Sequence, residues 1–329
     1  MVINTMRYFK LLSIIALIAG LNACEKYIPY DDIAPNPLMV VNGIQQVGQP
    51  AKLIVEKSSF YLGGTRDLRV KDVTAALFVN GEFKESLHVI DSGVYQTYTD
   101  WETGDEVSEL QYAFTYCEGT YILCEGDQLR FEVSSPEFEE TAMAECSLPA
   151  VPNVISFDTL KVEHYADNEN LANYSFALTI DDPAGANYYN FYPQQGLSAF
   201  TSSDPVFSDF MNVLDIEDMF GSESEYYGSG PYNVFNDQYF DGKQYSVEMK
   251  MSYWIDGNYI YEPFVVEVTC VDAGLYQYLK SYNTYSYVDG GLLELVTEPV
   301  QVYSNVRNGV GLVCAQSAPI TLSIDLTEN

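Results

Sequence analysis

Residues 73–87, VTAALFVNGEFKESL, decide the fold class of this chain. Residues 73–79 are mostly apolar and include three valines or threonines, which favour extended backbone. Asn80-Gly81 follows, and this dipeptide is a strong signal for a two-residue hairpin turn. The chain then returns through residues 83–87, so the stretch predicts a pair of antiparallel strands.

The same pattern continues on both sides of this hairpin. Short runs of strand-forming residues alternate with turn residues, and no amphipathic helix lies between them. The predicted strands are residues 38–42, 51–56, 93–99 and 128–134. Several short strands at this spacing predict a β-sandwich of the immunoglobulin-like or transthyretin-like kind, over residues 38–148.

A second region, residues 149–329, follows a proline-containing seam at residues 147–154. It contains further strand signals and one convincing helix, residues 272–285, with Asp272 placed to cap it. The expected elements are strands 174–180, 188–192, 300–305 and 320–326, a hairpin of 244–254 with 261–270, and a short helix near 205–211. The chain is therefore predicted to be mainly β, its second β-rich domain carrying one or two short helices.

The N-terminus carries the signature of an exported lipoprotein. Arg7 and Lys10 precede an apolar run at residues 11–21, which is too short to span a bilayer as a helix. Ala23 supplies the small residue before a cleavage point, and Cys24 follows it. We expect residues 1–23 to be removed, Cys24 to be lipidated, and residues 24–37 to form a tether. A plain secretory signal followed by a chance cysteine is the alternative.

The composition excludes one class of partner and leaves two others open. The net charge of −32 repels phosphate backbones, so no nucleic-acid partner is expected. The charge serves either solubility or a cationic partner surface. The 28 tyrosines and 17 phenylalanines, against 2 tryptophans, suit either strand packing or an exposed aromatic patch.

Five cysteines remain once Cys24 is assigned to the lipid. Cys117 and Cys124 flank a glycine-containing segment that could turn as a hairpin, which predicts a local disulfide. Cys270 and Cys314 could meet across a sheet as a second pair. Cys146 is then the expected free thiol.

No catalytic motif is recognisable, so no catalytic residues are assigned and the chain is not expected to be an enzyme. It has two histidines, no Gly-x-Ser-x-Gly elbow and no Walker-type phosphate loop. No cofactor is expected apart from a structural calcium ion, for which Asp237 and Asp241 are the candidate ligands. They share one turn with Asn236, while Asp181 and Asp182 lie in another. Acidic turns that are merely solvated are the alternative.

The order of motifs resembles the domain of unknown function 4249 family, outer-membrane lipoproteins typical of Bacteroidota. After Cys24 the resemblance rests on the opening stretch at residues 38–43, on residues 72–78 and 126–133, and on Asp182-Pro183 ahead of Tyr188-Tyr189. It continues in residues 235–243 and in the closing residues 298–311. The resemblance implies a lipoprotein of the outer membrane, on its periplasmic or cell-surface face, found beside TonB-dependent transporters, and it supplies no catalytic residues.

We therefore expect a lipid-anchored accessory protein that binds an outer-membrane protein partner, such as a TonB-dependent transporter, in uptake or envelope assembly. The predicted partner-binding residues lie in the aromatic and acidic stretch 201–233 and are Phe207, Phe210, Tyr226 and Tyr227. The alternatives are a surface lipoprotein that captures a glycan or peptide and, less expected, an envelope hydrolase with paired carboxylates.

Overall fold

The structure is a computed structural model of the whole chain. It describes residues 36–59, 67–99, 101, 103–165, 168–193, 200–201, 206, 211–213, 232–254, 264–288 and 301–324. Strands dominate these residues, and α3 (Ala273–Val288) is the one helix among them. The prediction of a mainly β chain is confirmed.

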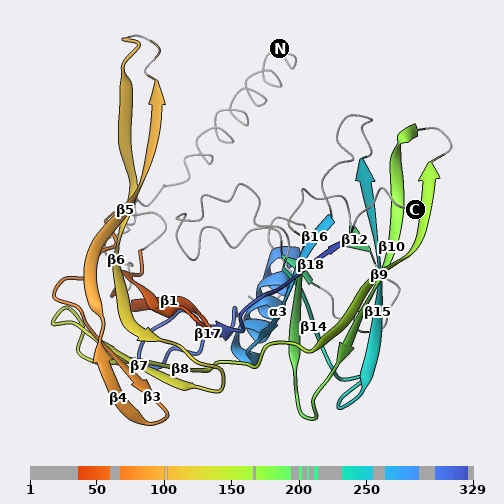
Figure 1. The fold of residues 1–329 in the computed structure, drawn as a ribbon. Coiled ribbons are helices and arrows are strands. Elements are labelled where there is room, and N and C mark those ends of the chain that lie inside the picture. The colour runs from red at the N-terminus through yellow and green to blue at the C-terminus, as the bar shows by residue number, and fades with distance from the viewer. Residues whose placement is uncertain are drawn as a thin grey trace, which may run out of the picture. The chain divides into compact units, whose positions relative to one another are not determined.

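The first part of the chain folds as two packed sheets (Figure 1). One is the end of a 10-stranded sheet, and this end contains β1 (Met39–Gln46), β2 (Pro50–Lys57), β6 (Glu106–Ile122) and β5 (His88–Thr99). The other contains β4 (Glu82–Ser86), β3 (Thr74–Val79), β7 (Gln128–Ser134) and β8 (Ala142–Ser147). Alternate residues of each strand point inward, so that Leu53 of one sheet and Phe131 of the other share a single buried core.

The predicted turn is present between β3 and β4. Asn80 and Gly81 both have positive φ, 53° and 86°, which a two-residue turn of the mirror-image type requires. Asn80 also accepts a hydrogen bond at 3.0 Å from the backbone of Gln128 on β7. The predicted hairpin is confirmed.

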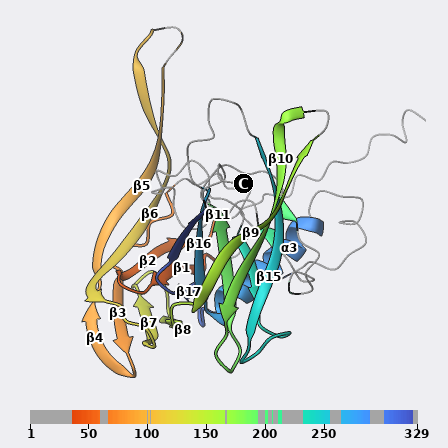
Figure 2. The same cartoon turned by 45° about the vertical axis from the view of Figure 1, so that its right-hand side comes forward.

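In the second part of the chain two sheets again face each other, a four-stranded sheet and the continuation of the 10-stranded sheet that contains β1 (Figure 2). One contains β9 (Val154–Tyr165), β10 (Asn168–Asp181), β15 (Gln244–Trp254) and β12 (Phe200–Thr201). Facing it are β11 (Tyr188–Pro193), β13 (Met211–Val213), β14 (Tyr232–Asn236), β16 (Phe264–Val271) and β18 (Ile320–Ile324). Aromatic rings fill the space between them, with Phe176 stacked on Phe264 at 5.2 Å between ring centroids.

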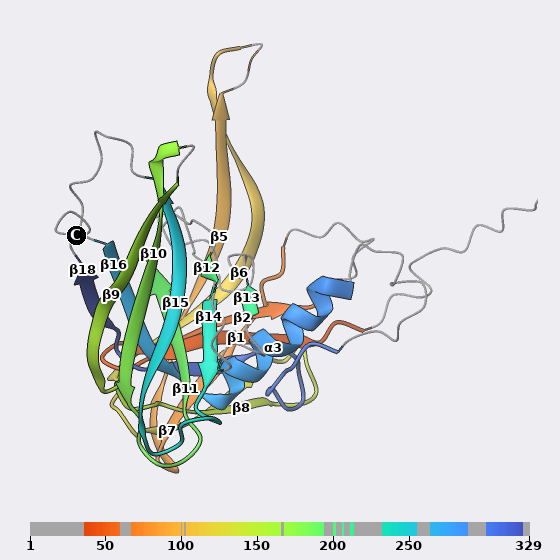
Figure 3. The ribbon, with the colours of Figure 1, turned by 90° about the vertical axis from the view of Figure 1, so that its right-hand side faces the viewer.

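Helix α3 covers the other face of the strands around β14 (Figure 3). Its buried residues Leu275 and Leu279 pack against Val234 and Cys314. Asp272 caps the helix, because its Oδ1 accepts a hydrogen bond at 2.8 Å from the backbone N–H of Leu275. The predicted helix and its cap are both confirmed.

The last strands return to the first one. β17 (Val313–Gln316) pairs in parallel with β1, and Gly43 lies opposite Val313. Because β1 precedes residue 149 and β17 follows it, this pairing carries the sheet across the predicted domain boundary, and β17 also pairs with β16. The opening and closing stretches of the family resemblance are therefore neighbours in space.

A glycine makes this close pairing of β1 and β17 sterically feasible. Gly311 has φ +122°, and a Cβ built there would lie 2.2 Å from the carbonyl oxygen of Val41. No other residue type tolerates both the backbone conformation and the contact. The division into domains 38–148 and 149–329 stays a prediction.

Three local predictions are wrong. Residues 301–305 form no strand. β15 and β16 form no hairpin, since β15 pairs with β10 whereas β16 pairs with β11 and β18. Residues 118–122, expected to turn, continue β6 instead, and Gly119 lies within that strand with the carboxylate of Glu85 2.5 Å from its would-be Cβ.

Candidate functional site

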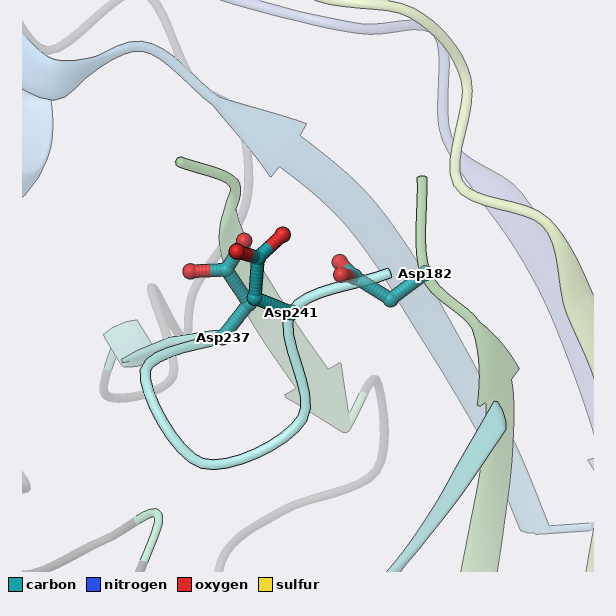
Figure 4. A group of neighbouring side chains, drawn as sticks. All are labelled: Asp182, Asp237 and Asp241. Carbon is teal, nitrogen blue, oxygen red and sulfur yellow. The ribbon is translucent and has the colours of Figure 1, made fainter. Parts of the chain in front are cut away.

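Three aspartates converge where two turns meet (Figure 4). Asp182 follows the end of β10, whereas Asp237 and Asp241 share the turn between β14 and β15. One carboxylate oxygen from each lies within 4.8 Å of the other two. The sequence predicted Asp237 and Asp241 as ligands and placed Asp182 in a separate turn, so the structure brings a third carboxylate to that pair. We call these residues the aspartate triad.

Protein hydrogen bonds already hold the triad in place. Asp182 accepts one bond from the Tyr189 hydroxyl and another at 2.8 Å from the backbone N–H of Gly242. Asp237 accepts the backbone N–H of Asn187 at 2.7 Å, and Asp241 accepts that of Gly185 at 2.8 Å. The three carboxylates thus fasten the β10–β11 loop to the turn before β15.

The triad concentrates negative charge in a protected place. Asp182 and Asp237 are both buried, at 5% exposure each, and in the described part of the chain neither forms an ion pair with lysine or arginine. Burial raises the pKa of Asp237, and the neighbouring Asp182 adds to the rise. Burial likewise raises the pKa of Tyr189. Asp237 Oδ2 already accepts two hydrogen bonds from Asn187, so a cation would use the other carboxylate oxygens of the triad, and calcium prefers such hard oxygen ligands.

A second feature is a two-stranded extension of the β5–β6 hairpin. β2 pairs with β6 as far as Thr115, while the pairing of β5 with β6 continues to Thr99 opposite Glu106. Residues 93–112 therefore extend past the partner strand β2, as the long orange and yellow hairpin of Figure 1 shows. We call residues 93–112 the arm.

The arm is aromatic, acidic and exposed. Tyr95, Tyr98 and Trp101 are 64%, 46% and 88% exposed. The sequence of the arm holds five acidic residues and no lysine, arginine or histidine. Sequence reasoning predicted a strand here without noticing this composition, although the long gap between Lys84 and Arg130 without lysine or arginine was a readable signal.

The first predicted disulfide is wrong: Cys117 and Cys124 are both free. They lie on one continuous strand and its extension, where about 3.3 Å per residue separates them by roughly 20 Å, far beyond disulfide reach. Cys117 is buried in the first core, whereas Cys124 is exposed.

The second predicted disulfide is also wrong, because Cys270 and Cys314 are free. Their strands are adjacent, yet Cys270 faces the core between the second pair of sheets and Cys314 faces α3. Side chains on opposite faces of a sheet cannot bridge. Cys146, the expected free thiol, is free and buried, and it is one of five free cysteines rather than the one left over from two disulfides.

The remaining predicted site residues are outside the part of the chain that the structure describes. They are the lipidated Cys24 and the partner-binding residues Phe207, Phe210, Tyr226 and Tyr227. Among the described residues, no helix combines the length and apolar character needed to cross a membrane.

Comparison with known proteins matches most of the chain to a family model. A family model described as "Domain of unknown function (DUF4249)" matches residues 25–318. No curated protein matches the chain. One solved structure, "Crystal structure of Putative membrane anchored protein from Corynebacterium diphtheriae", aligns at 10% identity and a TM-score of 0.20. The alignment covers 73% of this chain and 55% of that chain, and at this TM-score it carries no argument.

Proposed function

This chain belongs to the domain of unknown function 4249 family, and from that premise we propose that it is a lipid-anchored accessory protein of the outer membrane. Its role is to bind a membrane protein partner, with a TonB-dependent transporter as the partner type, in uptake or envelope assembly. The proposal assigns it no catalytic residues.

The anchor is supported by the sequence before the folded region. A basic start, an apolar run at residues 11–21 and Ala23 ahead of Cys24 form a lipoprotein signal. Two or more acyl chains on one cysteine hold a protein at a bilayer much more firmly than a single chain does.

The arm is the single observation that carries the partner role. A two-stranded ribbon beyond its supporting sheet is only marginally stable in water, and large exposed aromatic residues add an unfavourable hydration cost. Tyrosine and tryptophan are also the residues that most often anchor protein interfaces. Because the arm has five carboxylates and no basic group, its charge is complementary to a partner surface rich in lysine and arginine.

The test is affinity capture of the native lipoprotein from detergent-solubilised membranes. The decisive variant combines Tyr95→Ser, Tyr98→Ser and Trp101→Ser, all at exposed positions whose loss leaves the cores intact. Tyr239→Ser, at a residue 50% exposed on a different turn, is the matched control. We expect a stoichiometric membrane partner with the native protein and the control, and its loss with the triple variant. Recovery of the lipoprotein alone, or equal recovery of a partner with all three, would refute the role.

The proposal includes a structural calcium ion at the aspartate triad. Its support is the convergence of three carboxylates from two turns that are distant in sequence. Chelation with EGTA at constant ionic strength should then lower the melting temperature, and added calcium should restore it. An unchanged melting temperature would remove calcium from the proposal and leave the hydrogen bonds as the sole function of the triad.

A further inference from the structure

A cavity of about 710 Å³ lies beside the aspartate triad. Four segments line it: the end of β8 with the residues after it, the β10–β11 loop, the start of α3, and Tyr303 with Asn305. A hydrogen bond ties two of these segments together, since Asn305 donates to the carbonyl of Glu145 at 3.0 Å, and Asn305 is also held by the carbonyl of Val313 at 2.7 Å. A cavity of this size accommodates a small molecule, and its walls are fixed by the fold.

The charges that line the cavity have one sign. Its acidic residues are Glu145, Asp181, Asp182 and Asp272, and none of the lining residues is lysine, arginine or histidine. Arg307 pairs with Glu145 at 3.1 Å, on the exposed side. In the described part of the chain no such ion pair involves the other three carboxylates.

Aromatic groups complete the lining. Tyr188, Tyr189 and Tyr303 all contribute to it, and the accessible rings are those of Tyr188 and Tyr303, because Tyr189 is buried and stacked on phenylalanines. Tyrosine rings attract cations through their electron-rich faces and add apolar surface for a hydrocarbon stem. Carboxylates and tyrosines together, with no basic residue, favour a positively charged organic ligand over an anion.

We propose that this cavity binds a small organic cation whose positive charge is carried by an ammonium group, protonated or quaternary, or by a guanidinium group. The carboxylates of the lining, with Asp272 the one at the start of α3, supply the attraction, and the tyrosines supply the walls. The site is separate from the arm, so binding of the cation does not depend on the proposed membrane partner.

Protonation of Asp272 lowers the affinity of the cavity for a cation, because it removes one negative charge. Burial raises the pKa of this carboxyl to about 6, although hydrogen bonds from the start of α3 oppose the rise. The titratable groups that face it are Cys146 of β8, Cys314 of β17 and Tyr303. Because the two thiols are buried with raised pKa values, Asp272 is the group that changes charge between pH 5 and pH 7.5. A bound cation therefore gains attraction over that interval.

The experiment is isothermal titration of the mature lipoprotein in detergent, with EGTA present to exclude metal ions. Agmatine and choline are the cationic probes, maltose the neutral probe and succinate the anionic probe. Ala186 offers a matched pair of variants, because it lines the cavity and is itself exposed. Ala186→Arg introduces a competing guanidinium, whereas Ala186→Gln adds similar bulk without charge.

We expect saturable binding of agmatine or choline, with an affinity several-fold weaker at pH 5 than at pH 7.5. Ala186→Arg should weaken it about tenfold or more, and Ala186→Gln by about threefold at most. Three results would overturn the proposal: binding of maltose or succinate in preference to both cations, no saturation by either cation, or equal effects of the two variants. These three results do not depend on the arm, so they are independent of whether affinity capture recovers a membrane partner.

Discussion

Replacing Asp272 by asparagine should make the protein more stable at neutral pH than the native chain. The carboxyl is buried at the start of α3, where burial raises its pKa to about 6 from the ordinary value of 3.8. The folded state therefore binds a proton more tightly than the unfolded chain does. The contribution of this group to stability is greatest at low pH, where Asp272 is neutral in both states, and it falls as pH rises toward 6.

The size of this effect follows from the two pKa values. A carboxyl that titrates near 6 when folded and near 3.8 when unfolded costs about 3 kcal/mol of folding free energy once it is fully ionised. Asparagine avoids that cost and still caps the helix, since its side-chain oxygen can accept the Leu275 N–H as Asp272 does at 2.8 Å. Between pH 4.5 and pH 7.5, the stability advantage of Asp272→Asn should grow by about 2 kcal/mol.

The assay is urea unfolding at pH 4.5, 6.0 and 7.5, with Glu139→Gln as a control at an exposed carboxyl. Asp272→Ala separates capping from titration. It should be about 1 kcal/mol less stable than Asp272→Asn at every pH, and its stability relative to the native chain should rise with pH by the same amount as that of Asp272→Asn. An advantage of Asp272→Asn that stays constant with pH, or shrinks as pH rises, would contradict the assignment of a strained buried carboxylate.

Three further predictions concern the fold. Gly311→Ala should cost about 2–4 kcal/mol of stability or abolish folding, because its Cβ would meet the Val41 carbonyl. Gly48→Ala, also at a positive φ but in open space, should cost about 1 kcal/mol. Thermal unfolding compares the two variants, and equal losses of stability would refute the close pairing of β1 with β17. Phe176→Ala should destabilise by about 3–5 kcal/mol, since the ring is 1% exposed and stacked in the second core, and a loss under about 1 kcal/mol in denaturant unfolding would contradict that packing. Iodoacetamide without reductant should modify Cys124 alone in the native protein, because the other four structural cysteines are buried. After unfolding, mass spectrometry should find all five modified, and fewer than five additions would indicate a disulfide.

Local signals in the sequence were sufficient for many elements. The Asn80-Gly81 turn needs only positive φ at two residues, and the α3 helix is indicated by Asp272 and its apolar face. Such features depend on neighbours within a few residues, so one stretch of sequence contains all their determinants.

The errors arose where distant segments decide the structure. β15 and β16 are adjacent in sequence yet belong to different sheets, and strand periodicity carries no information about which strands pair. The segment between Cys117 and Cys124 was predicted to turn because it contains Gly119. That glycine instead lies within a strand, where the absence of a side chain leaves room for the carboxylate of Glu85. The contact of Asp182 with Asp237 likewise depends on the pairing of β10 with β15, which no local pattern reports.

The central claim is that this acidic β protein is held at a membrane through lipid on Cys24. The most direct measurement is mass spectrometry of the N-terminal peptide of the protein purified from its native membranes. We expect a peptide that begins at Cys24 and carries a diacylglyceryl group on the sulfur. A peptide that retains residues 1–23, or one that begins at Cys24 without lipid, would contradict it.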